Sequence, residues 1–487
     1  MPLSFDNSYT RLPDRFYVRV RPKAVPQPAW LVVNEPLGEL LGLSPEELRS
    51  PELLDTLAGN RILPGSEPIA LAYAGHQFGG FVPRLGDGRA LLLGEVIGKD
   101  GKRRDVQLKG SGPTPFSRGG DGRAALGPVL REFLVSEAMH TLGVPTTRAL
   151  AAVLTGELVY REQPLPGAVL TRVAASHLRI GTVEYFAYQR DREALALLVE
   201  HALARHYPER VGAEEPALAL LDGVMEAQAA LVARWLGLGF VHGVMNTDNC
   251  SLSGETLDYG PCAFLDAYDP GRTFSSIDHY GRYAFGNQPR ILLWNLARLA
   301  EALLPLLDGD DKSKIGTLEA RLERFPSLFE QAYGAVLREK LGLLQEQPGD
   351  LDLARALLDQ MARDRVDYTL AFRRLTRLAE SQEDTLSELF SNQELIHTWL
   401  TSWRQRLAAE PTSAEERSQR MRRANPAYIP RNHRVEEALA AAAQGDLAPF
   451  ERLRSVLAHP WDDHPEHVEL ALPPGEEQWR YRTFCGT

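Results

Sequence analysis

The hydrophobic pattern changes once along the chain, and this change restricts the possible folds more than any other feature of the sequence. Up to about residue 180, short aliphatic runs such as "ALLLGEVIG" and "AVLTRVA" alternate with glycine-bearing breaks such as "RLGDGR". Beyond about residue 190, apolar residues recur at three- and four-residue steps, as in "ALALLVEHALARHY". The first pattern predicts a twisted antiparallel sheet with hairpins, and the second predicts amphipathic helices.

We therefore expect an α+β chain, with a β-rich lobe over residues 1–180 and a large helical lobe over residues 181–487. The total of 487 residues exceeds the roughly 100–200 that are typical of one domain. One amphipathic helix is predicted inside the first lobe, over Leu126–Leu142, and Gly143 and Pro145 end it. No repeat of fixed period is present, which argues against a solenoid.

Composition excludes several classes of protein. The net charge of −11 argues against broad nucleic-acid binding, which needs a basic surface. No apolar run approaches the roughly 20 residues that cross a bilayer, and the first residues lack the pattern of a signal peptide. Three cysteines, Cys250, Cys262 and Cys485, are too few for a disulfide framework. We expect a cytoplasmic protein that binds neither membranes nor nucleic acids.

The stretch "FVHGVMNTDNCSLSGETLDYG", residues 240–260, has the spacing of a phosphotransferase active site. Protein kinases use H-R-D-x-x-x-x-N, in which the aspartate accepts a proton and the asparagine binds Mg²⁺. Counting from His242 places Asn249 at the asparagine position but Val244 at the aspartate position. Asp258 then begins a D-Y-G sequence that resembles the D-F-G metal loop. Asn249 and Asp258 are therefore candidate oxygen ligands for a hard cation.

The carboxylate that is absent at Val244 reappears four residues later, at Asp248. A general base contributes roughly 10²–10⁴-fold to a rate. Loss of the usual aspartate thus weakens such a site without abolishing it, and Asp248 is a candidate replacement. The alternative interpretation is a polar hairpin in which asparagine, aspartate and glycine only form turns.

Parts of a nucleotide site are also present in the predicted β-rich lobe. "RLGDGRALLLGEV" supplies Gly86 and Gly88 between strands, with Arg89 beside them, although an ordinary hairpin has the same composition. About twenty residues later, "DVQLKG" places Lys109 where kinases have their strand lysine.

A buried strand lysine needs a carboxylate partner. The helix that follows offers Glu132 and Glu137, which lie roughly 140° apart around a helix, so only one of them can face Lys109. We expect Glu132, because it comes about one turn after the apolar start of the helix.

Two further groups are candidates for phosphate contacts. "GSGPTPFSRGGDGRAALG", with Asp121 and Gly122 at its tip, is a glycine-rich loop that leads into a helix, an arrangement that suits an anion. The alternative is a flexible surface loop. Arg172 and Arg179, in "LTRVAASHLRIGT", are placed to clamp phosphate in a bidentate manner, although isolated arginines are usually solvated.

Several of these stretches resemble the SelO family, the selenoprotein O or YdiU pseudokinases, which act as protein adenylyltransferases. They include "YAGHQFGGFVPRLGDGRA", "DVQLKGSGPTPFSRGGDGRAALG", "LTRVAASHLRIGT", "GFVHGVMNTDNCSLSGETLDYG" and the terminal "RYRTFCGT". The resemblance implies a protein-kinase-like two-lobed fold in which ATP is inverted relative to kinases. It further implies transfer of AMP from ATP to Ser, Thr or Tyr hydroxyls of proteins, with Mg²⁺ or Mn²⁺ and with release of pyrophosphate.

The resemblance assigns a role to each candidate residue. Asp248 matches the proton acceptor, and Asn249 and Asp258 match the metal ligands. The residues that match the family's ATP contacts are Gly86, Gly88, Arg89, Lys109, Asp121, Gly122, Arg172, Arg179 and Asp258. Cys485 lies near the position where some members carry selenocysteine. Cys262 and Cys485 then form either a regulatory disulfide or, in a reducing cytosol, two free thiols.

Two other functions remain open at the level of sequence. The first is a catalytically inactive pseudokinase that serves as a binding module. The second is a small-molecule kinase of the aminoglycoside-phosphotransferase type, whose loop H-G-D-x-x-x-x-N shares its His-Gly with "HGVMNTDN".

Overall fold

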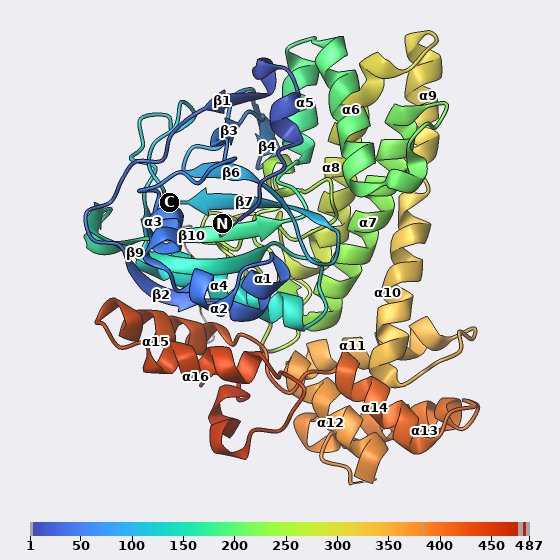
Figure 1. Cartoon of the computed structure of the whole chain (residues 1–487). Helices are drawn as coiled ribbons and strands as arrows, with labels where there is room; N and C mark the ends of the chain where they lie inside the picture. Colours follow the sequence, from blue (N-terminus) through green and yellow to red (C-terminus); the bar gives the residue numbers. More distant parts are fainter. Residues whose placement is uncertain (1–2, 382, 476–480, 484–487) are drawn as a thin grey trace.

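The structure, a computed structural model, describes residues 3–381, 383–475 and 481–483. A sheet with its covering helices forms one half of the molecule, and long helices stand beside and below it (Figure 1). The predicted α+β class is therefore confirmed.

The main sheet has the strand order β1-β3-β6-β7-β10-β9-β2, with β8 paired to β10, and its pairs are antiparallel. Its strands are β1 (Tyr17–Arg19), β2 (Ala29–Val33), β3 (Ile69–Leu71), β6 (Ala90–Ile97), β7 (Arg103–Lys109), β8 (Ala124–Ala125), β9 (Arg148–Tyr160) and β10 (Pro164–Ala174). Two small pairs lie outside it: β4 (Gly75–Gln77) with β5 (Gly80–Val82), and β11 (Phe240–Val241) with β12 (Ala263–Phe264).

Helices cover both faces of this sheet, which explains why β6 and β9 contain the long apolar runs "ALLL" and "ALAAVL". Side chains alternate between the two faces of a strand. On β9, Val153 packs among residues of the short helices α1 (Glu35–Leu40) and α3 (Pro51–Ala58). The neighbouring Ala152 packs among residues of α4 (Leu126–Thr141). The predicted helix over residues 126–142 is thus confirmed, and it lies directly on the sheet.

Helices account for most of the chain after β10. They are α5 (Ile180–Tyr188), α6 (Arg192–His206), α7 (Pro216–Leu238), α8 (Gln288–Leu303), α9 (Asp311–Leu322), α10 (Phe325–Leu341), α11 (Asp350–Asp364), α12 (Tyr368–Ser381), α13 (Gln393–Leu407), α14 (Ala414–Ala424), α15 (Asn432–Ala443) and α16 (Ala448–Leu457); the short α2 (Pro45–Leu48) precedes α3. The last strand of the main sheet ends at Ala174 and α5 begins at Ile180. A division into lobes at residue 180 stays a prediction.

Helix α7 occupies the centre of the helical part. Within the described chain it is the one helix that is long and apolar enough to cross a membrane, so the prediction that no apolar run approaches this length was wrong for Pro216–Leu238. Of its most apolar 18-residue window, 72% is buried inside the protein, as in the core helix of a soluble fold.

The last helices return to the sheet half of the molecule. Helices α15 and α16 lie next to the sheet half (Figure 1). Val435 of α15 and Phe450 of α16 share a buried cluster with Leu130 and Phe133 of α4. Helix α4 is therefore held between the sheet on one side and the C-terminal helices on the other. This sandwich restricts the movement of any side chain that α4 presents to the sheet.

A buried arginine joins the C-terminal helices to the centre of the molecule. Arg431, which precedes α15, is 1% exposed. Its guanidinium donates to Asp367 at 2.7 and 3.0 Å, to Asp266 at 2.8 Å and to the Ala471 carbonyl at 2.9 Å. A buried charge of this kind is tolerated only when it is fully paired.

We predict that Arg431→Ala lowers the free energy of unfolding by about 3–5 kcal/mol, because two carboxylates lose their shared cation. The matched control is Arg434→Ala, whose partially exposed pair with Glu437 contributes less than about 1 kcal/mol. Urea denaturation followed by circular dichroism measures both variants. Equal effects of the two substitutions would contradict the prediction.

Candidate functional site

Four charged side chains form a compact group between the sheet and α4. Lys109, the last residue of β7, donates from Nζ to Glu132 Oε2 at 2.5 Å and also to Asp258. Arg172 of β10 donates from Nε to the other oxygen of Glu132 at 2.7 Å and from Nη2 to Asp258 Oδ1 at 3.1 Å. We call Lys109, Glu132, Arg172 and Asp258 the central ion cluster. Each cation in it contacts both carboxylates.

The sheet register explains why these residues meet. Lys109 lies opposite Leu170, and Arg172 lies opposite Gln107. Because residues two apart on a strand share a face, Lys109 and Arg172 project from the same side of the sheet. Leu170 on that side packs with α4, so both cations point toward the helix. The expected Lys109–Glu132 pair is confirmed, whereas Glu137 binds Arg148 at 2.7 Å.

Opposite charges keep the central ion cluster ionised despite its burial. Burial by itself raises the pKa of Asp258, but Lys109 and Arg172 outweigh it and hold this pKa well below its usual range. Burial also raises the pKa of Glu132, and Arg172 and Lys109 again lower it overall. Two buried cations thus face two carboxylates, an arrangement that tolerates little displacement. A polyanionic ligand is well suited to the cationic half of such a site.

Two glycine-bearing loops flank β6 and β7: the loop with Gly86 and Gly88 precedes β6, and the loop of residues 110–123 follows β7. Gly86 has φ = +73°. A Cβ atom on it would lie 2.3 Å from the ring of Phe116, and one on Gly88 would lie 2.9 Å from the Phe116 carbonyl. A side chain at either position would therefore push the two loops apart. The structure brings these loops together, as a shared phosphate site requires.

The other predicted nucleotide contacts lie around these loops. Gly122 has φ = +65°, and its carbonyl accepts from the Gly112 N–H at 3.1 Å. Asp121, at the tip of the loop, pairs with Arg161 at 2.8 Å and is exposed. Arg89 lies next to the loops, and with Lys109 it lines a pocket of about 450 Å³.

His242 connects two segments that the kinase motif predicts: residues 242–249 and the D-Y-G segment that begins at Asp258. We call residues 242–249 the candidate catalytic loop. The buried imidazole donates from Nε2 to the Leu257 carbonyl at 3.0 Å and accepts at Nδ1 from the Val244 N–H at 3.4 Å. Burial lowers the pKa of His242, which favours this neutral form. The histidine therefore holds the loop against the residue that precedes Asp258.

Asn249 and Asp258 have the donor atoms of a hard-cation site. Asn249 donates from Nδ2 to the Val244 carbonyl at 3.2 Å, which leaves its amide oxygen as the group available to another partner. Within the described residues, no group of three or more His, Cys, Asp and Glu side chains is placed to hold a metal ion. A site of one amide and one carboxylate fits Mg²⁺, which commonly completes its shell with substrate phosphates and water.

Asp248 lies beneath the β4–β5 hairpin. The residue is 8% exposed, and Oδ2 accepts from Gln77 Nε2 at 3.4 Å. In the described part of the chain Oδ1 has no hydrogen-bond partner. Burial raises the pKa of Asp248 to about 6, although the charge of Arg179 opposes this shift. A buried oxygen without a hydrogen-bond partner destabilises the folded protein. Such oxygens therefore call for an explanation, and a catalytic role or a bound ion is a common one.

The two arginines predicted to act together contact different parts of the site. Arg172 belongs to the central ion cluster. Arg179 stacks over Tyr73, with 4.2 Å from its guanidinium carbon to the ring centre, and donates to the Asp248 carbonyl at 3.1 Å. Arg179 thus connects the sheet half of the molecule to the backbone of the candidate catalytic loop.

Sequence reasoning missed several residues that support this loop. Thr247 donates to Glu184 and accepts from the His76 N–H at 2.7 Å, and Asn246 accepts from the Phe78 N–H at 3.0 Å. One signal was available: Glu184 is the only charged residue in "IGTVEYFAY", the sequence of α5. A carboxylate in an otherwise apolar helix needs a polar partner.

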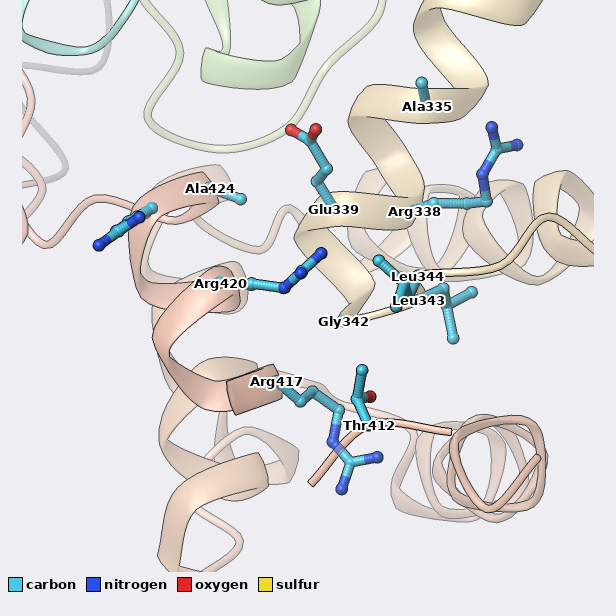
Figure 2. Close-up of a pocket in the computed structure, with 11 residues that line it drawn as sticks. Ala335, Arg338, Glu339, Gly342, Leu343, Leu344, Thr412, Arg417, Arg420 and Ala424 are labelled. Carbon is cyan, nitrogen blue, oxygen red and sulfur yellow. The ribbon is translucent and has the colours of Figure 1, made fainter. Parts of the chain in front are cut away.

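A second pocket of about 360 Å³ lies between α10 and α14, and none of the predicted site residues lines it (Figure 2). Three of its arginines have local partners: Arg338 pairs with Glu346 at 3.0 Å and Arg420 with Glu416 at 3.1 Å. Arg417 donates to the Leu407 carbonyl at 3.4 Å. The pocket near Lys109 is therefore the candidate functional site.

The choice between a Cys262–Cys485 disulfide and two free thiols stays open, because Cys485 lies outside the described residues. Cys262 is a buried thiol, and burial raises its pKa to about 11. It therefore stays protonated at neutral pH in this structure.

Together these features define the class of the protein. A strand lysine paired with a helix glutamate, followed by a histidine-led loop and an aspartate-led metal loop, is the arrangement of kinase-like nucleotide-binding proteins. This member of the class has Val244, buried, at the position of the usual base.

The chain belongs to the SelO family, because residues 1–458 match the family model described as "Protein adenylyltransferase SelO". A relative from Methylorubrum populi named "Protein nucleotidyltransferase YdiU" is 59% identical over 99% of both chains. A relative from Bradyrhizobium sp. (strain BTAi1) with the same name is 58% identical, again over 99% of both chains. Among solved structures, ROP2 from Toxoplasma gondii covers 64% of this chain and 89% of its own, at 11% identity and a TM-score of 0.27.

We predict that Gly75→Ala impairs the site without unfolding the protein. A Cβ atom on Gly75 would lie 2.6 Å from Asp248 Oδ1, so the carboxylate must move. Displacement of a reacting group by about 1 Å can reduce a rate about 10²-fold, and we expect a loss of this size in the initial rate of AMP transfer. The control is Gly316→Ala on α9, where a Cβ atom would meet no described atom within 4 Å apart from the neighbouring backbone of its own helix, and a slight stabilisation is expected. Full activity of Gly75→Ala would show that Asp248 need not hold this position.

Proposed function

We propose that this chain transfers AMP from ATP to Ser, Thr or Tyr hydroxyls of proteins. In this reaction the hydroxyl oxygen attacks the α-phosphorus and its proton leaves to a base. The bond from the α-phosphorus to the oxygen that bridges to the β-phosphorus breaks, and pyrophosphate departs with its bonding electrons. Family membership and the names of the relatives support a protein nucleotidyltransferase that uses ATP. The choice of hydroxyl and of metal is our proposal.

The central ion cluster is the observation that carries the proposal. Lys109 and Arg172 are buried cations that are already oriented by Glu132 and Asp258. Pyrophosphate gains negative charge as it leaves, and preorganised cations in a low-dielectric site stabilise such charge strongly. We assign Lys109, Arg172 and Arg179 to the β- and γ-phosphates. ATP is then inverted relative to kinases, with the α-phosphorus toward the acceptor.

The glycine loops would hold the remainder of the nucleotide. Backbone N–H groups of close-packed glycine turns bind phosphate oxygens well. The residues assigned to this role are Gly86, Gly88, Arg89, Asp121 and Gly122.

Asn249 and Asp258 would hold Mg²⁺ or Mn²⁺, which supplies charge neutralisation at the phosphates when bound. Asp258 contributes one oxygen to Lys109 and Arg172, so the same carboxylate orients the phosphate-binding cations. This double role makes Asp258 the residue on which the proposed site depends most.

Asp248 is the proposed proton acceptor. Its Oδ1 has no partner in the described structure, and its raised pKa of about 6 gives the carboxylate a higher proton affinity than an exposed aspartate has. Protein substrates are the proposed partners. The cytoplasmic location, and the absence of nucleic-acid and membrane partners, stay predictions.

We predict that Asp258→Ala lowers AMP transfer by at least about 100-fold, because metal binding and cation orientation are lost together. The measurement is incorporation of label from α-³²P-ATP into the proteins of a dialysed cell lysate, with MgCl₂ or MnCl₂. The control is Asp352→Ala, whose side chain is 85% exposed and remote from the site. Normal labelling by Asp258→Ala would contradict the assignment.

The same assay separates the alternative functions. Label from α-³²P-ATP without label from γ-³²P-ATP supports adenylylation. Label from γ-³²P-ATP alone identifies a kinase. An ATP-dependent rise in melting temperature without either label identifies an inactive binding module.

A further inference from the structure

Helix α5 lies against the candidate catalytic loop, and Glu184 is its one charged residue. Glu184 is 5% exposed. The helix also contacts the β4–β5 hairpin, since the Gly181 carbonyl accepts from the Ala74 N–H at 2.9 Å. A Cβ atom on Gly181 would lie 2.2 Å from the Ala74 oxygen, so this approach requires glycine. Glu184 is therefore placed where a hairpin from one half of the molecule meets a loop from the other half.

Three hydrogen bonds link Glu184, His76 and Thr247 in a closed ring. Glu184 Oε2 accepts from the Thr247 hydroxyl, and Glu184 Oε1 accepts from His76 Nδ1 at 2.5 Å. The His76 N–H donates to the Thr247 hydroxyl oxygen at 2.7 Å, which completes the ring. Each donor in this ring therefore has an acceptor, and each acceptor has a donor. The carboxylate thus fixes one residue of the hairpin and one residue of the loop at the same time.

The residues that follow His76 and Thr247 in the sequence contact each other, and one of them is the proposed proton acceptor. Gln77 follows His76, and Asp248 follows Thr247. Gln77 Nε2 donates to Asp248 Oδ2 at 3.4 Å, and Oδ1 is then the oxygen that has no partner among the described residues. The orientation of the Asp248 carboxylate therefore depends on the relative placement of the hairpin and the loop, which the ring around Glu184 sets.

We propose that Glu184 is a positioning residue for AMP transfer: through His76 and Thr247 it holds the β4–β5 hairpin on the candidate catalytic loop and so orients the carboxylate of Asp248. This inference rests on the proposed function. Lys109 and Arg172 receive their carboxylate contacts from Glu132 and Asp258, and among the described residues Glu184 forms no ion pair with them or with Arg179, the third cation assigned to phosphate. Removal of Glu184 therefore affects the rate of transfer and leaves nucleotide affinity unchanged.

The test is a double-mutant cycle with Asp248. Initial rates of labelling from saturating α-³²P-ATP are measured for the wild type, Glu184→Ala, Asp248→Ala and the double variant, with lysate proteins as acceptors. We expect Glu184→Ala to lower the rate by about 10- to 100-fold in the wild-type background. In the Asp248→Ala background we expect less than about a 2-fold loss, because the two residues act as one unit.

Conservative substitutions separate positioning from general destabilisation. Glu184→Gln is expected to keep at least about a third of the rate, because its amide oxygen still accepts from Thr247. Thr247→Val, which removes the donor hydroxyl, is expected to resemble Glu184→Ala, whereas Thr247→Ser restores most of the rate. Glu410→Ala removes an equally buried carboxylate remote from the site, and it is expected to lower the melting temperature without lowering the rate.

Three results would overturn the inference. The first is an equal loss from Glu184→Ala in both backgrounds. The second is an increase in the dissociation constant of Glu184→Ala for ATP–Mg²⁺, measured by calorimetry, that is large enough to account for its lower rate of labelling. The third is a Glu184→Gln variant as impaired as Glu184→Ala. A fully active Asp248→Ala variant is a separate outcome: it overturns the role of Asp248 in the proposed function and removes the route by which Glu184 acts.

Discussion

The contact of Lys109 and Arg172 with Glu132 and Asp258 is the interaction on which the rest of the site depends. It draws together two strands, the helix α4 and the loop that follows β11, although these segments are far apart in the sequence. Charges so deeply buried are stable only when their partners are placed with little freedom. The packing of α4 between the sheet and the C-terminal helices supplies that restriction, so the distant α15 and α16 also contribute to the geometry of the site.

A second framework holds the other half of the proposed chemistry. Helix α5 carries Arg179 at its N-terminal end and Glu184 within it, and both bind the candidate catalytic loop. Lys109 and Arg172, two of the three cations proposed to receive phosphate, therefore rest on the sheet and α4, while Asp248 rests on α5 and the β4–β5 hairpin. The third, Arg179, connects the two frameworks, because it also donates to the Asp248 carbonyl.

The loss of an aspartate at Val244 does not leave a disordered active site. His242 keeps a hydrogen-bonded role between Val244 and Leu257, and Asn249 is oriented by the Val244 carbonyl. The carboxylate has moved to Asp248, where a hairpin that lies beyond the spacing of the kinase motif contacts it. The loop is thus a rebuilt version of the kinase arrangement, in agreement with membership of a nucleotidyltransferase family.

Local patterns in the sequence determined the main secondary-structure elements of this protein and several residues of its candidate site. Periodicity predicted the sheet, the helix α4 and the helical remainder, because side-chain burial repeats with the geometry of each element. Motif spacing identified Lys109 and Asp258. Helical geometry showed that only one of Glu132 and Glu137 can face Lys109, and the position of Glu132 one turn after the apolar start of the helix selected it. Only the tertiary structure revealed that Glu184 supports the candidate catalytic loop, and that Arg172 and Arg179 contact different groups. These contacts join residues separated by tens to more than a hundred positions, and their existence depends on how whole elements pack, which local periodicity does not encode.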